Sequence, residues 1–332
     1  MQGLVTFPGR ADATQVAEVL APTEAPGTVL VRPLEIGVCG TDREISEGLF
    51  GVAPDGEDRL VLGHELLGRV ERDAGDFARG DLVTATVRRS CGHCIPCAQG
   101  APDSCDTGDY LERGITRLHG FAAELVAEAP EHLVPVPATL GRLGVLAEPA
   151  SVCERALRHV RAIGGRQPWR PRRALVVGTG AIGMLATYLL RMEGLDVWAA
   201  DRAPDGHKER LVQACGGRFA VTDDAQIMLD TLTLLRRNGV ACLLGIDGRP
   251  RDVSIDGRVL GVDAILENRA LFGSVNANRI DWSAAVAHLD GARARWPEAL
   301  EAFVGLRVPL DAYADAFAYR GVKATLELEG RA

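Results

Sequence analysis

Half of the eight cysteines in this chain of 332 residues lie close together in one polar stretch. Cys91, Cys94, Cys97 and Cys105 form a C-x2-C-x2-C-x7-C run. Four thiolates at such spacing can close around one tetrahedral zinc ion, and four sulfur ligands leave no open position for chemistry. A disulfide framework is typical of short secreted chains, and an iron–sulfur run usually ends in Cys-Pro, whereas Asp106 follows Cys105. The run therefore predicts a structural zinc site.

A second set of metal-binding residue types lies upstream of this run. Cys39 and the pair His64-Glu65 each follow a short apolar stretch typical of a strand, so each is expected where a strand ends. A lone cysteine is most often a small buried hydrophobic residue. The occurrence of Cys39 together with His64 and Glu65 favours a metal site instead. Cysteine, histidine and a carboxylate suit zinc, and three protein ligands leave a fourth position for water or substrate. The third ligand is expected to be Glu65 or the distant Glu148.

A glycine-rich turn indicates a nucleotide site further along the chain. The sequence Gly178-Thr179-Gly180-Ala181-Ile182-Gly183 follows an apolar strand-like run and precedes a helical pattern. A bare G-x-G-x-x-G is weak, but a strand before it and a helix after it are the context that confirms a dinucleotide-binding turn. The glycines let the backbone approach a pyrophosphate at the helix N-terminus. We expect the cofactor to bind at Gly178, Gly180, Ala181, Ile182 and Gly183.

The residue at the end of the next predicted strand bears on the choice of cofactor. Asp201 lies eighteen positions past Gly183. A carboxylate there holds the adenosine ribose hydroxyls and repels a 2′-phosphate, which favours NAD. Arg202 follows at once, and His207 and Lys208 are near, so these cations could instead pair with the 2′-phosphate of NADP. NAD is the preferred cofactor, and NADP stays possible.

The bulk composition narrows the classes of function. A net charge of −8 argues against binding the phosphate backbone of nucleic acid. No apolar run reaches the ~18–20 residues of a membrane-spanning helix, and the first residues lack the pattern of a secretion signal. Many cysteines without an export signal fit a reducing cytoplasm. We therefore expect a cytoplasmic protein of two domains that binds a small molecule, with neither nucleic acid nor membrane as a partner.

The order of these motifs resembles the zinc-dependent medium-chain alcohol and polyol dehydrogenases, and most of all their glucose dehydrogenase branch. The resemblance spans nearly the whole chain. It rests on residues 39–45, 62–65, 91–105, 112–115, 119–121, 178–183, 238–239, 273–278 and 319–324. It implies an α/β protein with a GroES-like, β-rich catalytic domain and a Rossmann domain with a doubly wound parallel sheet. The catalytic domain with both zincs would take residues 1–152 and 289–332, and the Rossmann domain residues 153–288.

The resemblance also implies roles for particular residues. Cys39, His64 and Glu148 would bind the catalytic zinc, with Glu65 as an exchanging ligand, and Thr41 would help carry away the proton of the substrate hydroxyl. The cofactor-binding set would also include Asp201, Arg202, Gly245, Val275 and Asn276, and the substrate contacts would be Glu112 and Asn278. Relatives form dimers or tetramers, so a homodimer or homotetramer is expected.

Two departures from the family pattern bear on function. Positions that can be polar sugar contacts in sugar-oxidising relatives are Val87 and Val152 here. The substrate is therefore expected to carry fewer hydroxyls on that side, or to be a different polyol, an aminocyclitol or a sugar attached to a larger group, and glucose itself is not favoured. In addition, only residues 222–239 separate two predicted strands, which is too few for the strand and helix that a complete Rossmann half needs. The shortening would follow residue 225. Either the element is absent or a stretch is missing from the sequence, and the intact flanking motifs favour the second.

The sequence thus predicts a zinc-dependent enzyme that moves a hydride from a secondary alcohol of a sugar, polyol or cyclitol-like substrate to NAD(P). Two zinc ions per chain are expected, one catalytic and one structural. The alternative is a binding or regulatory protein that keeps the fold without turnover. A zinc-free quinone reductase of the same fold is disfavoured because Cys39 and His64 are both present.

Overall fold

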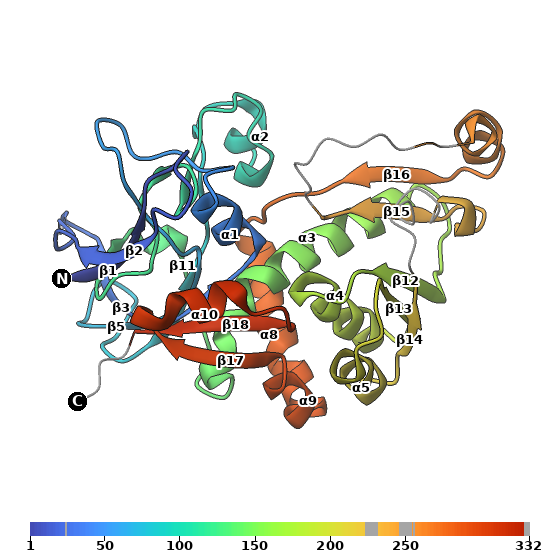
Figure 1. Ribbon diagram of the computed structural model, residues 1–332. Coiled ribbons are helices and arrows are strands. Elements are labelled where there is room, and N and C mark those ends of the chain that lie inside the picture. The colour runs from blue at the N-terminus through green and yellow to red at the C-terminus, as the bar shows by residue number, and fades with distance from the viewer. Residues whose placement is uncertain (24, 223–231, 246–253, 255, 329–332) are drawn as a thin grey trace. The chain divides into compact units, whose positions relative to one another are not determined.

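The computed structural model describes residues 1–23, 25–222, 232–245, 254 and 256–328. The chain divides into two compact units (Figure 1). The first unit combines Met1–Ser151 with Asn276–Ala332, and the second is Val152–Val275. The return to the first unit therefore begins at Asn276, earlier than the residue 289 expected from sequence. None of the described helices is long and apolar enough to cross a membrane.

The largest sheet of the first unit brings together strands from distant parts of the sequence. Its members are β3 (Val29–Val38), β5 (Glu65–Val70), β6 (Leu82–Ala85), β10 (Val126–Glu128), β11 (Leu133–Pro135), β17 (Val304–Pro309) and β18 (Lys323–Glu327). Their order is β11-β6-β5-β3-β18-β17, with β10 also paired to β3. Among the described pairs of this sheet, β17 with β18 is parallel and the others are antiparallel. The C-terminal strand β18 thus lies next to β3 near the sheet centre, with helix α10 (Tyr313–Ala318) packed on β17 and β18 (Figure 1).

Two small sheets and several short helices complete the first unit. One sheet pairs β1 (Gln2–Thr6) with β2 (Gln15–Glu18) and β4 (Leu60–Val61), and the other has the order β7 (Arg88–Arg89), β8 (Leu111–Arg113), β9 (Arg117–Leu118). The α-helices are α1 (Gly40–Ser46), α2 (Ile95–Ala98), α8 (Arg279–Arg295) and α9 (Pro297–Glu301). The 3-10 turns are η1 (Pro102–Ser104), η2 (Pro130–His132), η3 (Gly141–Leu146) and η5 (Leu310–Ala312). Helix α3 (Ala147–Gly164) begins in the first unit and continues into the second.

The second unit contains the strand–turn–helix predicted from the glycine-rich sequence. Strands β12 (Arg173–Val177), β13 (Asp196–Asp201) and β14 (Arg218–Val221) form a parallel sheet in that order. Helix α4 (Ala181–Met192) connects β12 to β13, and α5 (Gly206–Ala214) connects β13 to β14 (Figure 1). Helix α4 packs on β12 and β13 with one apolar face, as a crossover helix in a βαβ unit does.

The remaining strands of the second unit form a separate sheet. Strands β15 (Val240–Leu243) and β16 (Ala270–Gly273) pair in parallel, and the π-helix η4 (Val259–Asp263) with α7 (Ala264–Leu266) precedes β16. In the described ranges no strand joins β12 to β15. The junction that the sequence places at residues 225–228 lies outside the described residues.

One face of the three-stranded sheet is open to solvent. Leu175 and Trp198 are register partners on β12 and β13, and both are 41% exposed, while Val177 on the same face is 40% exposed. Parallel sheets are ordinarily covered on both faces by helices. The second unit therefore lacks, among its described residues, the cover that a doubly wound sheet has on this side.

Candidate metal centres and dinucleotide site

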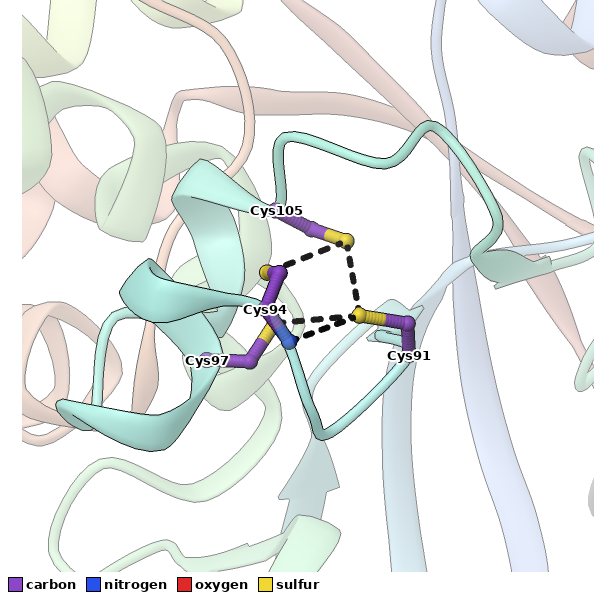
Figure 2. A group of neighbouring side chains, drawn as sticks. All are labelled: Cys91, Cys94, Cys97 and Cys105. Carbon is purple, nitrogen blue, oxygen red and sulfur yellow. Dashed lines mark hydrogen bonds between the residues drawn. The ribbon is translucent and has the colours of Figure 1, made fainter.

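The four cysteines of the run converge on one point in the first unit. Figure 2 shows their sulfur atoms facing one another from helix α2 and the loops on either side of it. The Sγ atoms of Cys91 and Cys105 are 3.6 Å apart, and the Cys91–Cys97 and Cys94–Cys105 pairs are both 3.9 Å apart. A tetrahedron with zinc–sulfur bonds of ~2.3 Å separates its sulfurs by about 3.8 Å. The group fits one zinc ion, and these distances are too long for disulfides.

Local hydrogen bonds favour the thiolate form of two of the four cysteines, Cys91 and Cys105. Gly92 adopts a positive φ of 75°, which lets the chain turn between Cys91 and Cys94. Hydrogen bonds from the Thr107 hydroxyl and from backbone N–H groups lower the pKa of Cys91 to about 5. The Thr107 hydroxyl also lies 3.3 Å from Cys105 Sγ and lowers the pKa of that thiol. Burial instead raises the pKa of Cys94 to about 12, so this thiol would lose its proton only as the metal binds. The sulfur positions agree with the donor set predicted from the sequence.

Cys39, His64 and Glu65 form the second group, with one ligand atom from each lying within 4.8 Å of the others. Cys39 Sγ is 3.2 Å from His64 Nε2. A zinc ion bound to both would separate these atoms by about 3.5 Å, so the pair fits such an ion. His64 and Glu65 are buried and Cys39 is half-buried. This donor set has three members, of which Cys39 is the most exposed.

The imidazole of His64 is oriented by Asp42, which the sequence analysis did not single out as a site residue. Asp42 Oδ1 lies 3.3 Å from His64 Nδ1, and Asp42 Oδ2 accepts a hydrogen bond of 2.9 Å from the Cys39 backbone N–H. Burial lowers the pKa of His64, but the Cys39 thiol and the Asp42 carboxylate together raise it well above its ordinary value. The raised pKa favours the doubly protonated ring in the metal-free site, so zinc has to displace the Nε2 proton. A proton kept on Nδ1, beside Asp42, would then leave the Nε2 lone pair for the metal on the side of Cys39. The capping box of α1, in which the Cys39 side chain also accepts the Thr41 N–H, fixes this geometry.

One member of this group, Glu65, also forms a buried ion pair. Lys323 Nζ pairs with Glu65 Oε2, and both side chains are 1% exposed. Glu65 is on β5 and Lys323 on β18, and the strand between them, β3, carries Gly37 at the crossing point. A Cβ on Gly37 would lie 1.9 Å from Glu65 Oε2. Glycine at this position is therefore what allows the two charged side chains to meet across the sheet.

The other predicted residues of this centre lie nearby. Glu148 is on the first turn of α3 and is not part of the Cys39–His64–Glu65 group. Burial first and then the negative charge of Glu65 raise the pKa of Glu148 to about 7. Thr41 is half-buried on α1, and its backbone N–H donates to Cys39 Sγ over 3.2 Å.

The glycine-rich turn of the second unit has the geometry that a pyrophosphate site requires. Gly178 has a φ of +90°, and a Cβ on Gly183 would lie 1.7 Å from the Gly178 carbonyl oxygen. A Cβ on Gly180, the N-cap of α4, would meet no atom within 4 Å. Ala181 and Ile182 form the first turn of α4, whose N-terminus favours an anion.

Asp201 carries more partners than the sequence suggested. Thr179 Oγ1 donates to Asp201 Oδ2, and Lys208 Nζ lies 2.9 Å from the same oxygen. The Arg202 backbone N–H donates to Asp201 Oδ1 over 2.8 Å, while the Arg202 side chain is exposed. Burial would raise the pKa of Asp201, but these bonds lower it. Because Lys208 neutralises the carboxylate, the argument for NAD against NADP is weaker than the sequence alone implied.

The side chains expected to contact the sugar and the nicotinamide form hydrogen bonds with other residues of the protein. Glu112 Oε1 accepts hydrogen bonds from Arg88 and, over 2.9 Å, from Asn276 Nδ2. Asn278 is the N-cap of α8, with its side chain accepting the Ile280 N–H over 2.9 Å. Two further predicted cofactor residues, Gly245 after β15 and Val275 after β16, are both exposed in the second unit.

Comparison with known proteins covers almost the whole chain. Residues 25–138 match the family described as alcohol dehydrogenase GroES-like domain. Residues 141–227 and 219–328 match the family described as glucose dehydrogenase C-terminus, in two segments that overlap. The expected fold class, a GroES-like domain with a Rossmann domain, is confirmed by these matches and by the related solved structures.

Similar proteins carry glucose dehydrogenase names. Glucose 1-dehydrogenase of Methanocella arvoryzae is 40% identical over 338 residues, which covers 94% of each chain. Glucose 1-dehydrogenase 1 of Caldivirga maquilingensis is 37% identical and covers 99% of each. Its alignment runs over 352 positions, 20 more than the 332 residues of this chain, so that relative has residues that this chain lacks.

A solved structure extends the comparison to bound groups. Haloferax mediterranei glucose dehydrogenase, in complex with NADP, Zn and gluconolactone, superimposes with a TM-score of 0.90 at 29% identity and full coverage of both chains. The two cysteine-containing groups, the glycine-rich turn and these similarities agree. The chain belongs to the zinc-dependent medium-chain alcohol dehydrogenases, in their glucose dehydrogenase-like branch, and is a zinc- and NAD(P)-dependent sugar or alcohol dehydrogenase.

Proposed function

We propose that the protein oxidises a secondary alcohol of a sugar, polyol or cyclitol-like substrate and passes the hydride to NAD or NADP. The observation that carries the proposal is the convergence of Cys39, His64 and Glu65, with Asp42 behind the imidazole. Zinc held there would act as a Lewis acid and lower the pKa of the substrate hydroxyl. The structural group at Cys91 has no open position and is not expected to take part in the chemistry.

Side chains of the first unit supply the other requirements. Asp42 keeps the His64 ring in the orientation that a metal ligand needs. We propose Glu148 as the third ligand, as the family resemblance implies. Burial and the charge of Glu65 raise its pKa to about 7, and a cation held nearby would favour the ionised form again. Thr41 is proposed to accept the hydrogen bond of the substrate hydroxyl and to help move its proton away. Lys323 holds Glu65 and so controls whether that carboxylate reaches the metal.

The substrate is proposed to present its hydroxyls mainly towards Glu112, which is bonded to Asn276, the residue that the resemblance assigns to the cofactor. Val87 is buried and apolar, so it offers no hydrogen bond to a ligand. Gluconolactone in the Haloferax mediterranei structure is what oxidation of a glucose ring at its anomeric hydroxyl gives, which supports a hexose-like ring as the substrate class. The ring form of an aldose has such an anomeric hydroxyl, whereas a cyclitol and an open-chain polyol do not.

A substrate panel tests the proposal. Zinc-loaded protein would be incubated with aldoses, polyols and cyclitols, with NAD and NADP separately, and reduced nicotinamide and oxidised product would be measured. The expected result is turnover of at least one ring sugar, with a lactone or keto product identified by mass spectrometry. Absence of product with every compound in both cofactor series would contradict the proposal.

A protein that binds cofactor without turnover is the second candidate. It is favoured by the grouping of the described strands of the second unit into two separate sheets and by the exposed face at Leu175 and Trp198. Zinc content does not separate the two candidates, since both would keep the metal. Measurable binding of NAD or NADP together with no hydride transfer to or from any sugar would support the second.

We also propose that the protein forms a homodimer or homotetramer, as its resemblance to the family implies. Light scattering coupled to size-exclusion chromatography measures the mass in solution. A mass near 70 or 140 kDa, about two or four times the 35.4 kDa of the chain, is the expected result. A mass near that of the single chain would contradict it.

A further inference from the structure

Arg88 joins the four-cysteine loop to the predicted sugar and nicotinamide contacts. From β7, its Nε donates to Glu112 Oε1 over 3.1 Å, and its Nη2 lies 3.0 Å from the same oxygen in an ion pair. Its Nη1 donates to the Asp103 backbone carbonyl over 3.0 Å. Asp103 is part of η1, which lies between Cys97 and Cys105. The Arg88 guanidinium also lies 3.8 Å from the centroid of an aromatic ring, that of Tyr110. The Arg88 side chain is 9% exposed, so water competes little for these bonds.

The far end of this connection is Asn276. Its Nδ2 donates to the same Glu112 Oε1 over 2.9 Å, and its Oδ1 accepts the Ala277 N–H over 2.7 Å. Asn276 has a φ of +66°, a left-handed conformation that asparagine tolerates better than most residues. Both polar atoms of the Asn276 amide are therefore hydrogen-bonded, the nitrogen to Glu112 and the oxygen to the Ala277 backbone.

All the described bonds to Glu112 fall on Oε1. No described residue hydrogen-bonds to Oε2, so this oxygen can accept a substrate hydroxyl. Arg88 thus does two things at once. It neutralises the carboxylate, and it ties the position of the carboxylate to a backbone carbonyl of the cysteine loop.

We propose that Arg88 is a positioning residue through which the four-cysteine zinc loop orients Glu112 and Asn276 for the sugar. The inference deepens the proposed function, because it assumes that Glu112 and Asn276 face substrate and cofactor. The guanidinium bonds Glu112 through Nε and the Asp103 carbonyl through Nη1, two donors on separate atoms of one rigid plane. The single nitrogen of a lysine does not reproduce this spacing, so we expect it to keep only the bond to Glu112.

Arg88→Lys separates this role from simple charge neutralisation, since lysine keeps the positive charge beside Glu112 but loses the second bond. The matched control is Arg89→Lys. Arg89 is the next residue of β7, is 13% exposed and pairs with Glu128, without contacting Glu112. In the zinc-loaded enzyme we expect R88K to raise the KM for the sugar about tenfold, with a smaller change in kcat. R89K should leave the KM within about twofold of the wild type. Equal KM values in R88K and R89K would overturn the proposal.

Hydrogen exchange gives a readout that does not depend on turnover. The Ala277 amide is bonded to Asn276 Oδ1, so loosening Asn276 should speed its exchange. We expect faster exchange of a peptide covering residues 273–278 in R88K and in Cys105→Ser, and no change in R89K. Combining R88K with C105S should add little beyond either alone, because both break one connection. Unchanged exchange in R88K, or fully additive effects, would overturn the proposal. If the wild-type enzyme turned over no sugar, the proposed function would fail, and the exchange data would still decide the link.

Discussion

Replacing Lys323 by methionine (K323M) removes the ammonium group that faces Glu65 inside the seven-stranded sheet. Methionine has a similar length and no charge, so the main effect is the loss of the ion pair. Both partners are 1% exposed, so solvent cannot replace the missing cation. Removing one partner of a buried pair costs about 3–5 kcal/mol, because the remaining charge is left uncompensated. We expect the zinc-free K323M protein to lose stability by that amount.

A second substitution tests whether this loss comes from the Glu65 charge. Glu65→Gln (E65Q) in the K323M background removes the unpaired carboxylate while keeping the volume. Replacing both members of a buried pair is often nearly neutral, so the double variant should recover most of the loss. The expected interaction energy between the two positions is about 2–3 kcal/mol. Added zinc should also reduce the loss in K323M, since a cation near Glu65 partly replaces the ammonium group.

Urea unfolding of the wild type, both single variants and the double variant measures these quantities. Midpoints at fixed zinc concentration are compared, because a protein of two compact units need not unfold in one step. A loss below about 1 kcal/mol in K323M, the range of an exposed pair, would refute the reasoning. A double variant no more stable than K323M would refute it equally.

Three other predictions concern separate parts of the protein. Lys208→Met should lower the affinity for NADP about tenfold more than that for NAD, since Asp201 then repels the 2′-phosphate; equal losses by titration calorimetry would contradict this. Burial and the nearby Arg89 lower the pKa of His132 to about 4, below its ordinary 6.5, so the unfolded chain takes up this proton first as the pH falls. The wild type should therefore lose more stability between pH 6.5 and 4 than H132Q in urea unfolding, and parallel curves would refute the assignment. Cys97→Ser should release one zinc ion per chain and lower the thermal midpoint, whereas an unchanged midpoint would count against structural zinc.

The metal-binding residues could be predicted because the cysteine run is local and its spacing alone nearly determines the geometry. The partners of those residues could not. Lys323 meets Glu65 only because β18 pairs with β3, and no sequence pattern specifies that register across nearly the whole chain. Asp42 lies three positions after Cys39, which is the spacing of a capping box. This spacing could have shown that Cys39 and Asp42 together cap the N-terminus of α1.

Contacts assigned by resemblance were the least specific part of the sequence analysis. Asn278, three residues before Asp281, has the capping-box spacing, and the structure uses both to start α8. Glu112 was expected to contact a sugar hydroxyl. Its partner Arg88 could not be predicted, because the bond from Arg88 to the Asp103 carbonyl depends on a turn of the cysteine loop that the pattern of apolar residues does not specify. In the second unit, the local strand–turn–helix was predictable, whereas the separation into two sheets depends on long-range pairing.

Transfer of a labelled hydride tests the central claim most directly. A sugar carrying deuterium on its carbinol carbon would be incubated with zinc-loaded protein and NAD or NADP, and the reduced nicotinamide would be analysed by mass spectrometry. The account predicts a reduced cofactor one mass unit heavier than with the unlabelled sugar, and none of it with Cys39→Ser. Unlabelled reduced cofactor, or none with any sugar, polyol or cyclitol, would contradict the assignment of the Cys39–His64–Glu65 group as the centre of a hydride-transferring enzyme.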